Sequence, residues 1–226
     1  MTNRRILEGE NVVAIFDILG FRELVHSTLP SEFRTLLDDV LCLAGAAPID
    51  QEMVGSMVFS DTIILYGRTS ELDMNVFAVT VSASNLLNAA ARRGLPIRGS
   101  LSSGALLIDE NKTLLVGVPV VRAYEHQQTQ QWMGAIVHPE CEARFSAVMS
   151  QSAVPESVLL YRAPMKSGPR LKYLCVGWTF RLAGNRSILE GAFPGAENSH
   201  DVWAKQQNTL AFFDYCEPLR ERSRYP

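Results

Sequence analysis

Residues 11–20 read NVVAIFDILG, and this stretch decides the predicted fold. Residues 12–16 are apolar and rich in β-branched side chains, which favours a buried central strand. Asp17 carries the only charge of the stretch, and Gly20 follows soon after it. Because burial of a lone carboxylate costs free energy or raises its pKa, we expect Asp17 to have a partner or a metal ion.

A second informative stretch, residues 53–66, reads MVGSMVFSDTIILY. Two apolar runs flank Ser60-Asp61-Thr62, which predicts a hairpin of strands with Asp61 at its turn. Residues 72–93 then carry apolar side chains at helical spacing, and Gly94 and Pro96 indicate where that helix ends.

The rest of the chain alternates between strand and helix patterns. Ser31 is predicted to cap a helix that runs to about Ala44, although the capping box is incomplete. Further strands are predicted at residues 97–108, 133–137, 157–161 and 172–180. Further helices are predicted at 140–149 and 202–215, and residues 114–121 are expected to open another helix that continues through residues 123–127. This order predicts an α+β fold with helices largely on one face, as in the split βαβ of ferredoxin-like folds.

Composition limits the classes of function. The 226 residues, 47% hydrophobic and 20% charged, fit a single domain (1–226) with a core at about 11–140 and a C-terminal elaboration at about 155–226. A net charge of −3 argues against nucleic acid or an anionic membrane as partner. No apolar run reaches the ~20 residues of a membrane span, and nothing before Asn11 resembles a signal peptide.

The cysteines and histidines indicate no metal site. Each residue type is scattered, without the close spacing of zinc ligands. We expect the cysteines to be buried free thiols in a reducing cytoplasm, and we assign the histidines no role. The cysteines are Cys42, Cys141, Cys175 and Cys216.

Four motifs in register resemble the class III nucleotidyl cyclases. Residues 17–21 (DILGF) match the family's Asp-Ile-x-Gly-Phe, and Asp61 matches a second metal-binding Asp in a hairpin turn. Residues 98–104 (RGSLSSG) resemble Arg-x-Gly-Ile-x-x-Gly, and residues 117–120 (GVPV) match Gly-x-x-Val before a helix. The resemblance covers about residues 11–140 and implies a class III catalytic domain with C-terminal strands and helix.

The resemblance also implies a two-metal mechanism. Asp17 and Asp61 would hold two divalent ions, Mn²⁺ or Mg²⁺, with the carbonyl of Ile18 as a further ligand. Gly20 and Phe21 would turn the backbone toward the triphosphate, so that amides donate to phosphate oxygens. The expected reaction is cyclisation of a nucleoside triphosphate with release of pyrophosphate, the work of a phosphorus–oxygen lyase.

This chain departs from the family where the nucleotide is read. Met57 stands where purine cyclases have a base-reading Lys, and Leu114 stands where they have a second reader, usually Asp. The Asn-x-x-x-Arg pair that positions the ribose and stabilises the transition state aligns with Val121 and Glu125. An acidic residue at the second position cannot neutralise developing negative charge.

Both metal carboxylates remain while the base readers are replaced, which favours retuned specificity. The pattern resembles the bacterial pyrimidine cyclases of the Pycsar anti-phage defence system. That resemblance implies UTP or CTP as substrate, with UTP favoured, and cyclic UMP or cyclic CMP as a second messenger for a separate effector protein.

Several cations are candidates to replace the missing pair. Arg98 lies on the strand beside the metal hairpin, and Arg122 is next to the vacated Asn position. Lys172, with Lys166 and Arg170, flanks the late hairpin where relatives place a triphosphate-gripping Lys. Class III sites are shared across a head-to-tail dimer, so we expect a homodimer in which the 114–125 region of one chain faces the metal carboxylates of the other.

Two alternatives stay open. A catalytically inactive pseudo-cyclase would bind nucleotide as a sensor or scaffold without releasing pyrophosphate. An interaction scaffold would use Asp17 and Asp61 only as capping residues. A diguanylate cyclase is disfavoured because no Gly-Gly-Asp/Glu-Glu-Phe stretch occurs.

Overall fold

A computed structural model describes residues 5–45, 52–168, 171–182 and 185–223. The strands are β1 Ile6–Ile18, β2 Val54–Phe59, β3 Thr62–Gly67, β4 Ile97–Asp109, β5 Leu114–Val116, β6 Gly134–Val137, β7 Val158–Tyr161 and β8 Tyr173–Val176. The α-helices are α1 Phe21–Ser27, α2 Pro30–Gly45, α3 Leu72–Arg92, α4 Val118–Gln128, α5 Glu142–Ser150, α6 Arg186–Gly191 and α7 His200–Ser223. Short 3₁₀ turns lie at Pro139–Cys141, Pro155–Ser157 and Thr179–Leu182.

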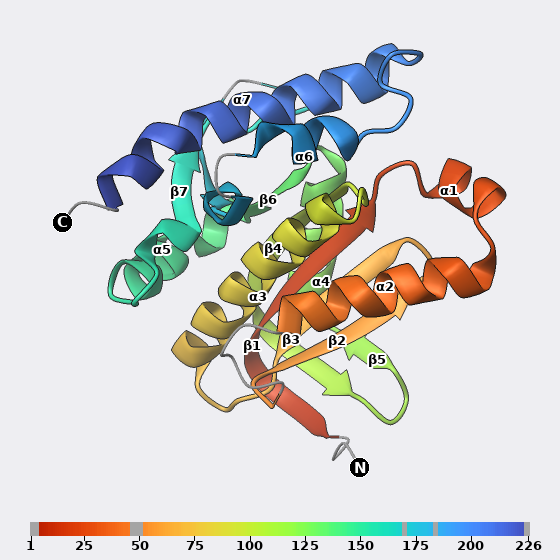
Figure 1. Cartoon of the computed structure of the whole chain (residues 1–226). Coiled ribbons are helices and arrows are strands. Elements are labelled where there is room, and N and C mark those ends of the chain that lie inside the picture. The colour runs from red at the N-terminus through yellow and green to blue at the C-terminus, as the bar shows by residue number, and fades with distance from the viewer. Residues whose placement is uncertain (1–4, 46–51, 169–170, 183–184, 224–226) are drawn as a thin grey trace.

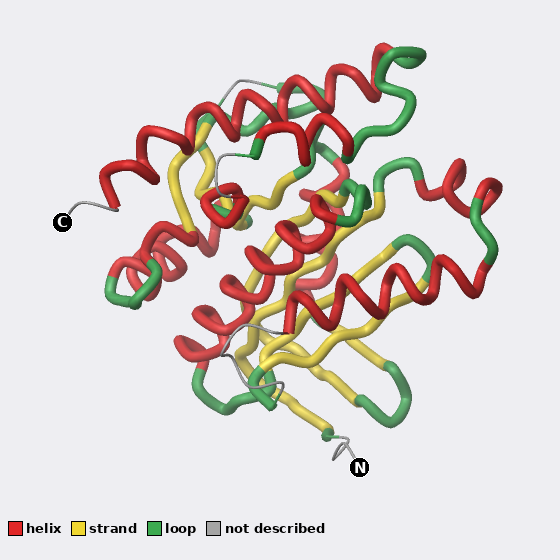
Figure 2. The backbone as a smooth tube through the Cα atoms, in the orientation of Figure 1, coloured by secondary structure: helices red, strands yellow, loops and turns green. Residues whose placement is uncertain are grey.

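The described strands form one eight-stranded sheet in the order β2-β3-β1-β4-β6-β8-β7, with β5 paired to β4. β1 is antiparallel to both of its neighbours, β3 and β4, whereas β4 and β6 are parallel. Figure 1 shows α2 and α3 on the near face of this sheet and α4 behind it, while α6 and α7 lie together along one end. Figure 2 shows the same arrangement, with the helices in red on either side of the strands in yellow. The predicted α+β sheet with helices largely on one face is therefore the observed architecture.

The core explains why β1 is central. Residues 12–16 are at most 2% exposed, and their side chains alternate between the two faces of the sheet. Val12, Ala14 and Phe16 belong to the main cluster with α3, whereas Val13 and Ile15 belong to a smaller cluster that includes Ala123 of α4. A strand buried on both faces needs a continuous apolar run, which is what the sequence provides.

Glycine ends α3 as the sequence predicts. Gly94 has a left-handed φ of 67°. Its N–H donates to the carbonyl of Ala91, and the N–H of Leu95 donates to the carbonyl of Ala90. These bonds form a Schellman motif, which needs a residue of positive φ after the helix. α3 therefore ends before β4, the strand that carries Arg98.

Some local predictions are wrong. α2 begins at Pro30, so Ser31 lies inside the helix, and the Glu32 carboxylate instead accepts the N–H of Leu29. The predicted strand at 172–180 ends at Val176 because Thr179–Leu182 forms a 3₁₀ turn. β5 and α6 were not expected, and α7 extends beyond both predicted ends.

The cysteine prediction is largely confirmed. All four cysteines are free thiols, and Cys141, Cys175 and Cys216 are buried, whereas Cys42 is exposed. Phe212 and Phe213 of α7 lie in the core. Within the described part of the chain, none of the helices combines the length and hydrophobicity that crossing a bilayer requires.

Replacing Gly99 tests the packing beneath the site. A Cβ on Gly99 would lie 2.4 Å from the Phe16 ring and 2.9 Å from the Ile15 carbonyl oxygen. We expect Gly99→Ala to lower the free energy of unfolding by about 1–3 kcal/mol, because overpacking displaces buried groups. Urea denaturation measures this change. Gly191→Ala is the control, since a Cβ there meets nothing within 4 Å; equal stability of the two variants would contradict the packing argument.

Candidate functional site

The structure brings Asp17 and Asp61 to the same end of the sheet. Asp17 pairs with Thr62 of β3 on one side and with Arg98 of β4 on the other. The N–H of Ile18 donates to the carbonyl of Asp61 at 2.9 Å, which ties the end of β1 to the hairpin turn. Ser60 opens that turn with φ 56°, so the hairpin reverses beside Ile18.

Arg98 contacts one oxygen of Asp17. Its Nε and Nη2 donate to Oδ2 at 3.1 and 2.9 Å. The two side chains are 11% and 20% exposed, so the ion pair is poorly hydrated. Burial raises the pKa of Asp17, the Arg98 guanidinium opposes that rise, and the charge of Asp61 adds to it. Asp17 and Asp61 are thus near enough to repel each other.

Gln130 holds the guanidinium in place. Its carbonyl accepts Nη1 of Arg98 at 2.9 Å. Its buried side chain donates to the carbonyl of Gly99 at 2.7 Å and accepts the indole N–H of Trp132 at 2.8 Å. Both ends of the amide are therefore engaged, and the carbonyl that receives Arg98 has a fixed position.

Two carboxylates suit a hard divalent cation. Among the described residues, no group of three or more His, Cys, Asp or Glu side chains could hold a metal ion. Asp17 and Asp61 with the Ile18 carbonyl would nevertheless offer only oxygen donors, which Mg²⁺ and Mn²⁺ prefer. A cation between the carboxylates would also oppose the burial and the Asp61 charge, which both raise the pKa of Asp17. The donor set therefore fits the predicted metals.

Lys166 lies close to this site and Lys172 does not. The charges of Arg98 and Asp17 both act on Lys166, and partial burial is the main cause that lowers the pKa of this lysine. β8 is antiparallel to β6, with Cys175 opposite Ile136, so Lys172 lies beyond the far end of β6. In the same chain Lys172 cannot join Asp17, and Arg170 falls outside the described residues.

The loop after β1 has the predicted turn. Gly20 adopts φ 74°, and its carbonyl accepts the N–H of Leu24, which starts α1. Phe21 is half-buried and packs edge-to-face on Phe33 of α2, with ring centroids 5.5 Å apart. The ring therefore anchors α1 on α2, and the glycine allows the reversal that places α1 beside the end of β1.

The positions that read the nucleotide in relatives lie on β2, β5 and α4. Met57 is half-buried and packs on the smaller cluster with Ile64, on the face that α4 covers. Leu114 at the start of β5 is 39% exposed. Val121 and Glu125 are exposed on α4, whereas Arg122 pairs with Glu140. Within one chain, Arg122 has a carboxylate partner and does not approach the carboxylates of the site.

The sequence did not indicate several residues that shape the site. No sequence motif includes these residues, and only their contacts in the folded chain identify them. They are Gln130, Gln131, Asp201 and Lys205. His126 and His138, treated as dispersed, pack ring to ring with centroids 5.3 Å apart. Burial lowers the pKa of His126 to about 4, so this histidine is neutral at pH 7 and packs in the fold.

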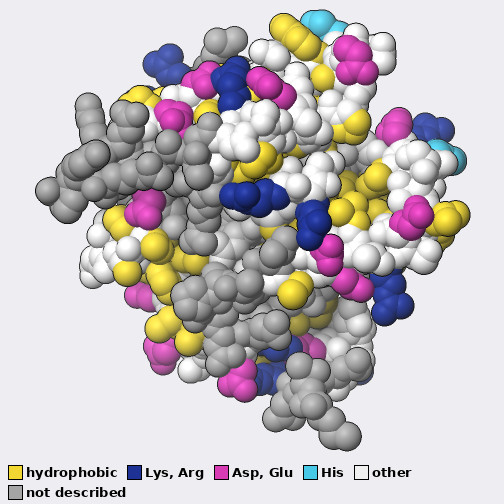
Figure 3. Space-filling view, in the orientation of Figure 1, with side chains coloured by type: hydrophobic (Ala, Val, Ile, Leu, Met, Phe, Trp, Pro, Cys, Tyr) yellow, Lys and Arg dark blue, Asp and Glu magenta, His cyan; other side chains and the backbone are white. Residues whose placement is uncertain are grey.

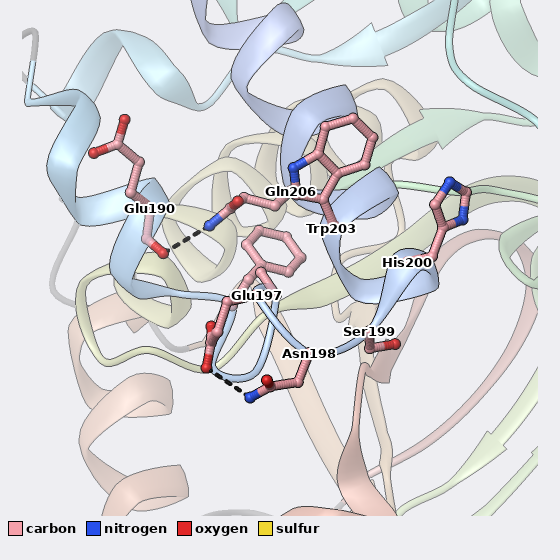
Figure 4. Close-up of a pocket in the computed structure, with 9 residues that line it drawn as sticks. Glu190, Glu197, Asn198, Ser199, His200, Trp203 and Gln206 are labelled. Atoms are coloured by element: carbon pink, nitrogen blue, oxygen red, sulfur yellow. Dashed lines mark hydrogen bonds between the residues drawn. The ribbon is translucent and has the colours of Figure 1, made fainter.

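A pocket of about 700 Å³ lies elsewhere, at the connection between α6 and α7. Figure 4 shows Trp203 and Gln206 of α7 on one side of it and Glu197 and Asn198 on the other. None of the predicted site residues lines this pocket. On the face in Figure 3, acidic and basic side chains of the described residues alternate without a large region of one sign.

Comparisons with known proteins support the fold. A scan against protein-family models found no match, and a search of curated proteins found no similar sequence. Among solved structures, the adenylyl cyclase CyaB from P. aeruginosa superposes with a TM-score of 0.52 at 14% identity, over 76% of this chain and 96% of that chain. The catalytic core of a rhodopsin-guanylyl cyclase in complex with ATPαS gives 0.54 at 14% identity, over 76% and 98%.

The guanylate cyclase domain of RhGC from Catenaria anguillulae, in complex with GTP, gives 0.52 at 14% identity, over 77% of this chain and 99% of that chain. Similarity at these identities establishes the fold. The chain has the α+β fold of a class III cyclase catalytic domain, as the sequence predicts.

A double-mutant cycle tests the Asp17–Arg98 pair. Arg98→Ala should lower the free energy of unfolding by about 1–3 kcal/mol, because it leaves a desolvated carboxylate without its partner. Adding Asp17→Asn should recover much of that loss, since removal of both charges costs less than removal of one. Urea denaturation of the four proteins gives the coupling energy. Strictly additive losses would show that the pair does not stabilise the fold.

Proposed function

We propose that this protein is a nucleotidyl cyclase of the class III type that acts on a pyrimidine nucleoside triphosphate. The observation that carries the proposal is the meeting of Asp17 and Asp61 at one end of the sheet, through the bond from Ile18 to the hairpin turn. This arrangement lies in a fold shared with cyclase domains bound to GTP and ATPαS. The fold alone would not carry an activity.

The reaction joins the ribose 3′-oxygen to the α-phosphorus. The 3′-hydroxyl loses its proton to solvent, the new bond to the α-phosphorus forms, and the bond to the pyrophosphate leaving group breaks. Divalent ions held by Asp17, Asp61 and the Ile18 carbonyl would supply Lewis acidity for the hydroxyl and the triphosphate. Arg98 occupies only Oδ2 of Asp17. Arg98 therefore orients the carboxylate so that Oδ1 can bind a metal ion.

Cationic and amide groups would complete the phosphate site. Lys166 lies close enough to Asp17 for their charges to interact, so it is placed to neutralise phosphate charge. The backbone turns at Gly20 where β1 ends, and the amides that follow this turn would donate to phosphate oxygens. Lys172 lies beyond the end of β6 that is distant from Asp17, so it would act only on the site of a partner chain.

The pyrimidine preference is inferred from the apolar reader positions. Met57 and Leu114 offer no charged or hydrogen-bonding group to a purine. A smaller uracil or cytosine ring needs fewer polar readers, and we favour UTP over CTP. The cyclic nucleotide would serve as a second messenger for an effector protein in anti-phage defence.

A homodimer would complete the site. β5 and α4 expose a run of large apolar side chains, which a monomer rarely leaves in water. These are Leu114, Val116, Val118, Val121 and Tyr124, exposed by 39%, 52%, 60%, 54% and 48%. They surround the positions that face the nucleotide in relatives, so a second copy packed there would bring Arg122 of one chain toward the carboxylates of the other.

Product analysis tests the activity. The purified protein is incubated with ATP, GTP, CTP and UTP in turn with Mn²⁺, and the products are identified by mass. We expect one cyclic pyrimidine monophosphate from the natural protein and at least a 100-fold lower rate from Asp61→Asn, because an amide cannot replace a carboxylate ligand.

Asp73→Asn is the matched control, since Asp73 is an exposed carboxylate that pairs with Arg144 away from the site. Full activity of Asp61→Asn would contradict the metal assignment. Metal-dependent nucleotide binding without any product would favour the inactive pseudo-cyclase, for which the exposed Val121 and Glu125 are the supporting observation.

Oligomeric mass tests the proposed interface. Val118→Asp places a charge on the exposed apolar surface of β5 and α4. An acidic residue in the first turn of α4 favours the helix, so the fold should persist. Sedimentation should give twice 25.1 kDa for the natural protein and for Leu29→Asp, an exposed site on another surface, but a monomer without activity for Val118→Asp. An active Val118→Asp monomer would refute a shared site.

A further inference from the structure

Residues 129–131 connect the candidate site to distant parts of the chain. The carbonyl of Thr129 accepts the backbone N–H of Lys166 at 2.7 Å. The next carbonyl, that of Gln130, accepts Arg98 Nη1 at 2.9 Å. This segment therefore holds the guanidinium of Arg98 on β4 and the backbone of Lys166 in the β7–β8 connection at the same end of the sheet.

The same segment binds the first half of α7. The side-chain amide of Gln131 donates to Oδ1 of Asp201 at 2.6 Å, and the carbonyl of Gln131 accepts the side-chain amide of Asn208 at 2.8 Å. Lys205 lies one helical turn after Asp201 and pairs with its other carboxylate oxygen. Its side chain is only 16% exposed. α7 thus holds Lys205 in a defined position next to residues 129–131.

These contacts gather three cations. Lys166 lies within electrostatic range of Arg98 and of Lys205, and burial together with these like charges lowers its pKa. Asp17 and Asp201 are the carboxylates whose charges act on Lys166. If Asp17 binds a metal ion, it no longer balances the lysines. Cations brought together in this way repel one another, and a bound polyanion removes that cost.

We propose that Lys205 of α7 joins Lys166 in a phosphate-binding subsite, contributed by one chain, for the terminal phosphates of the substrate. The proposal rests on the proposed function for the identity of the polyanion, a nucleoside triphosphate. Asp201 positions Lys205 through their ion pair and lowers the local positive charge. The C-terminal helix is therefore part of the substrate site as well as of the fold.

The two members of the ion pair then have opposite effects. Lys205→Gln removes a charge-assisted contact and should weaken binding of a polyphosphate about tenfold. Asp201→Asn keeps an oxygen that accepts from Gln131 but removes a negative charge beside the subsite. It should strengthen the binding about threefold, because the freed lysine faces the anion alone.

Calorimetric titration with inorganic tripolyphosphate in the presence of Mg²⁺ measures these changes on the full chain. Arg34→Gln is the matched control, because Arg34 forms an exposed pair with Asp38 at the same helical spacing, on α2. Its affinity should equal that of the natural protein. Thermal melting of each variant establishes that it is folded.

The outcomes separate this subsite from a structural role of α7. Weaker binding in Lys205→Gln with stronger binding in Asp201→Asn supports the proposal. Unchanged affinity in Lys205→Gln, or equal weakening in both variants, overturns it. Formation of a cyclic nucleotide with affinity independent of Lys205 would leave the proposed function intact. Lys205-dependent binding without any cyclic product would instead remove the proposed function and keep a polyphosphate subsite.

Discussion

Asp17 lies at the end of a strand whose preceding residues are buried, and its ion pair with Arg98 is the interaction on which the candidate site depends. A carboxylate in this position is costly without a partner, and Arg98 provides one across β1 and β4. Because the guanidinium uses a single carboxylate oxygen, the pair both stabilises the end of the sheet and fixes the carboxylate's orientation. The hairpin turn then adds Asp61 beside it through the Ile18 N–H.

The guanidinium of Arg98 is held in turn by residues 130–133, which also bond to α7 near the C-terminal end of the chain. Gln130 supports Arg98, while Gln131 and Met133 are bonded to α7 through Asn208 and Thr209. Residues 130–133 therefore connect α7 to the guanidinium that pairs with Asp17. This continuity connects the long helix to the Asp17–Arg98 pair.

The sequence predicted what depends on local pattern. The apolar run before Asp17, the hairpin around Asp61 and the glycine after α3 each have a local physical cause, and each was found at the expected place. Ser31 failed as a cap because Pro30 suits the first position of a helix and Glu32 supplies the bond to the backbone. β5 was missed because three residues are too few for a clear period.

Long-range partners were beyond sequence reasoning. Lys172 was preferred to Lys166 from its place near a late hairpin, yet the antiparallel pairing of β8 with β6 takes it to the far end of the strand. Lys205 and Gln130 gave no signal, since their roles depend on backbone carbonyls and an ion pair formed only in the folded chain. Specific contacts of this kind follow from topology, not from residue type.

Anomalous diffraction from crystals grown with Mn²⁺ and a non-hydrolysable UTP analogue would test the central claim most directly, which is that Asp17 and Asp61 hold catalytic metal. If this claim holds, anomalous peaks will lie about 2.1 Å from carboxylate oxygens of both residues, with Arg98 still on Oδ2 of Asp17. Nucleotide bound without metal at these carboxylates, or manganese bound only elsewhere, would contradict it.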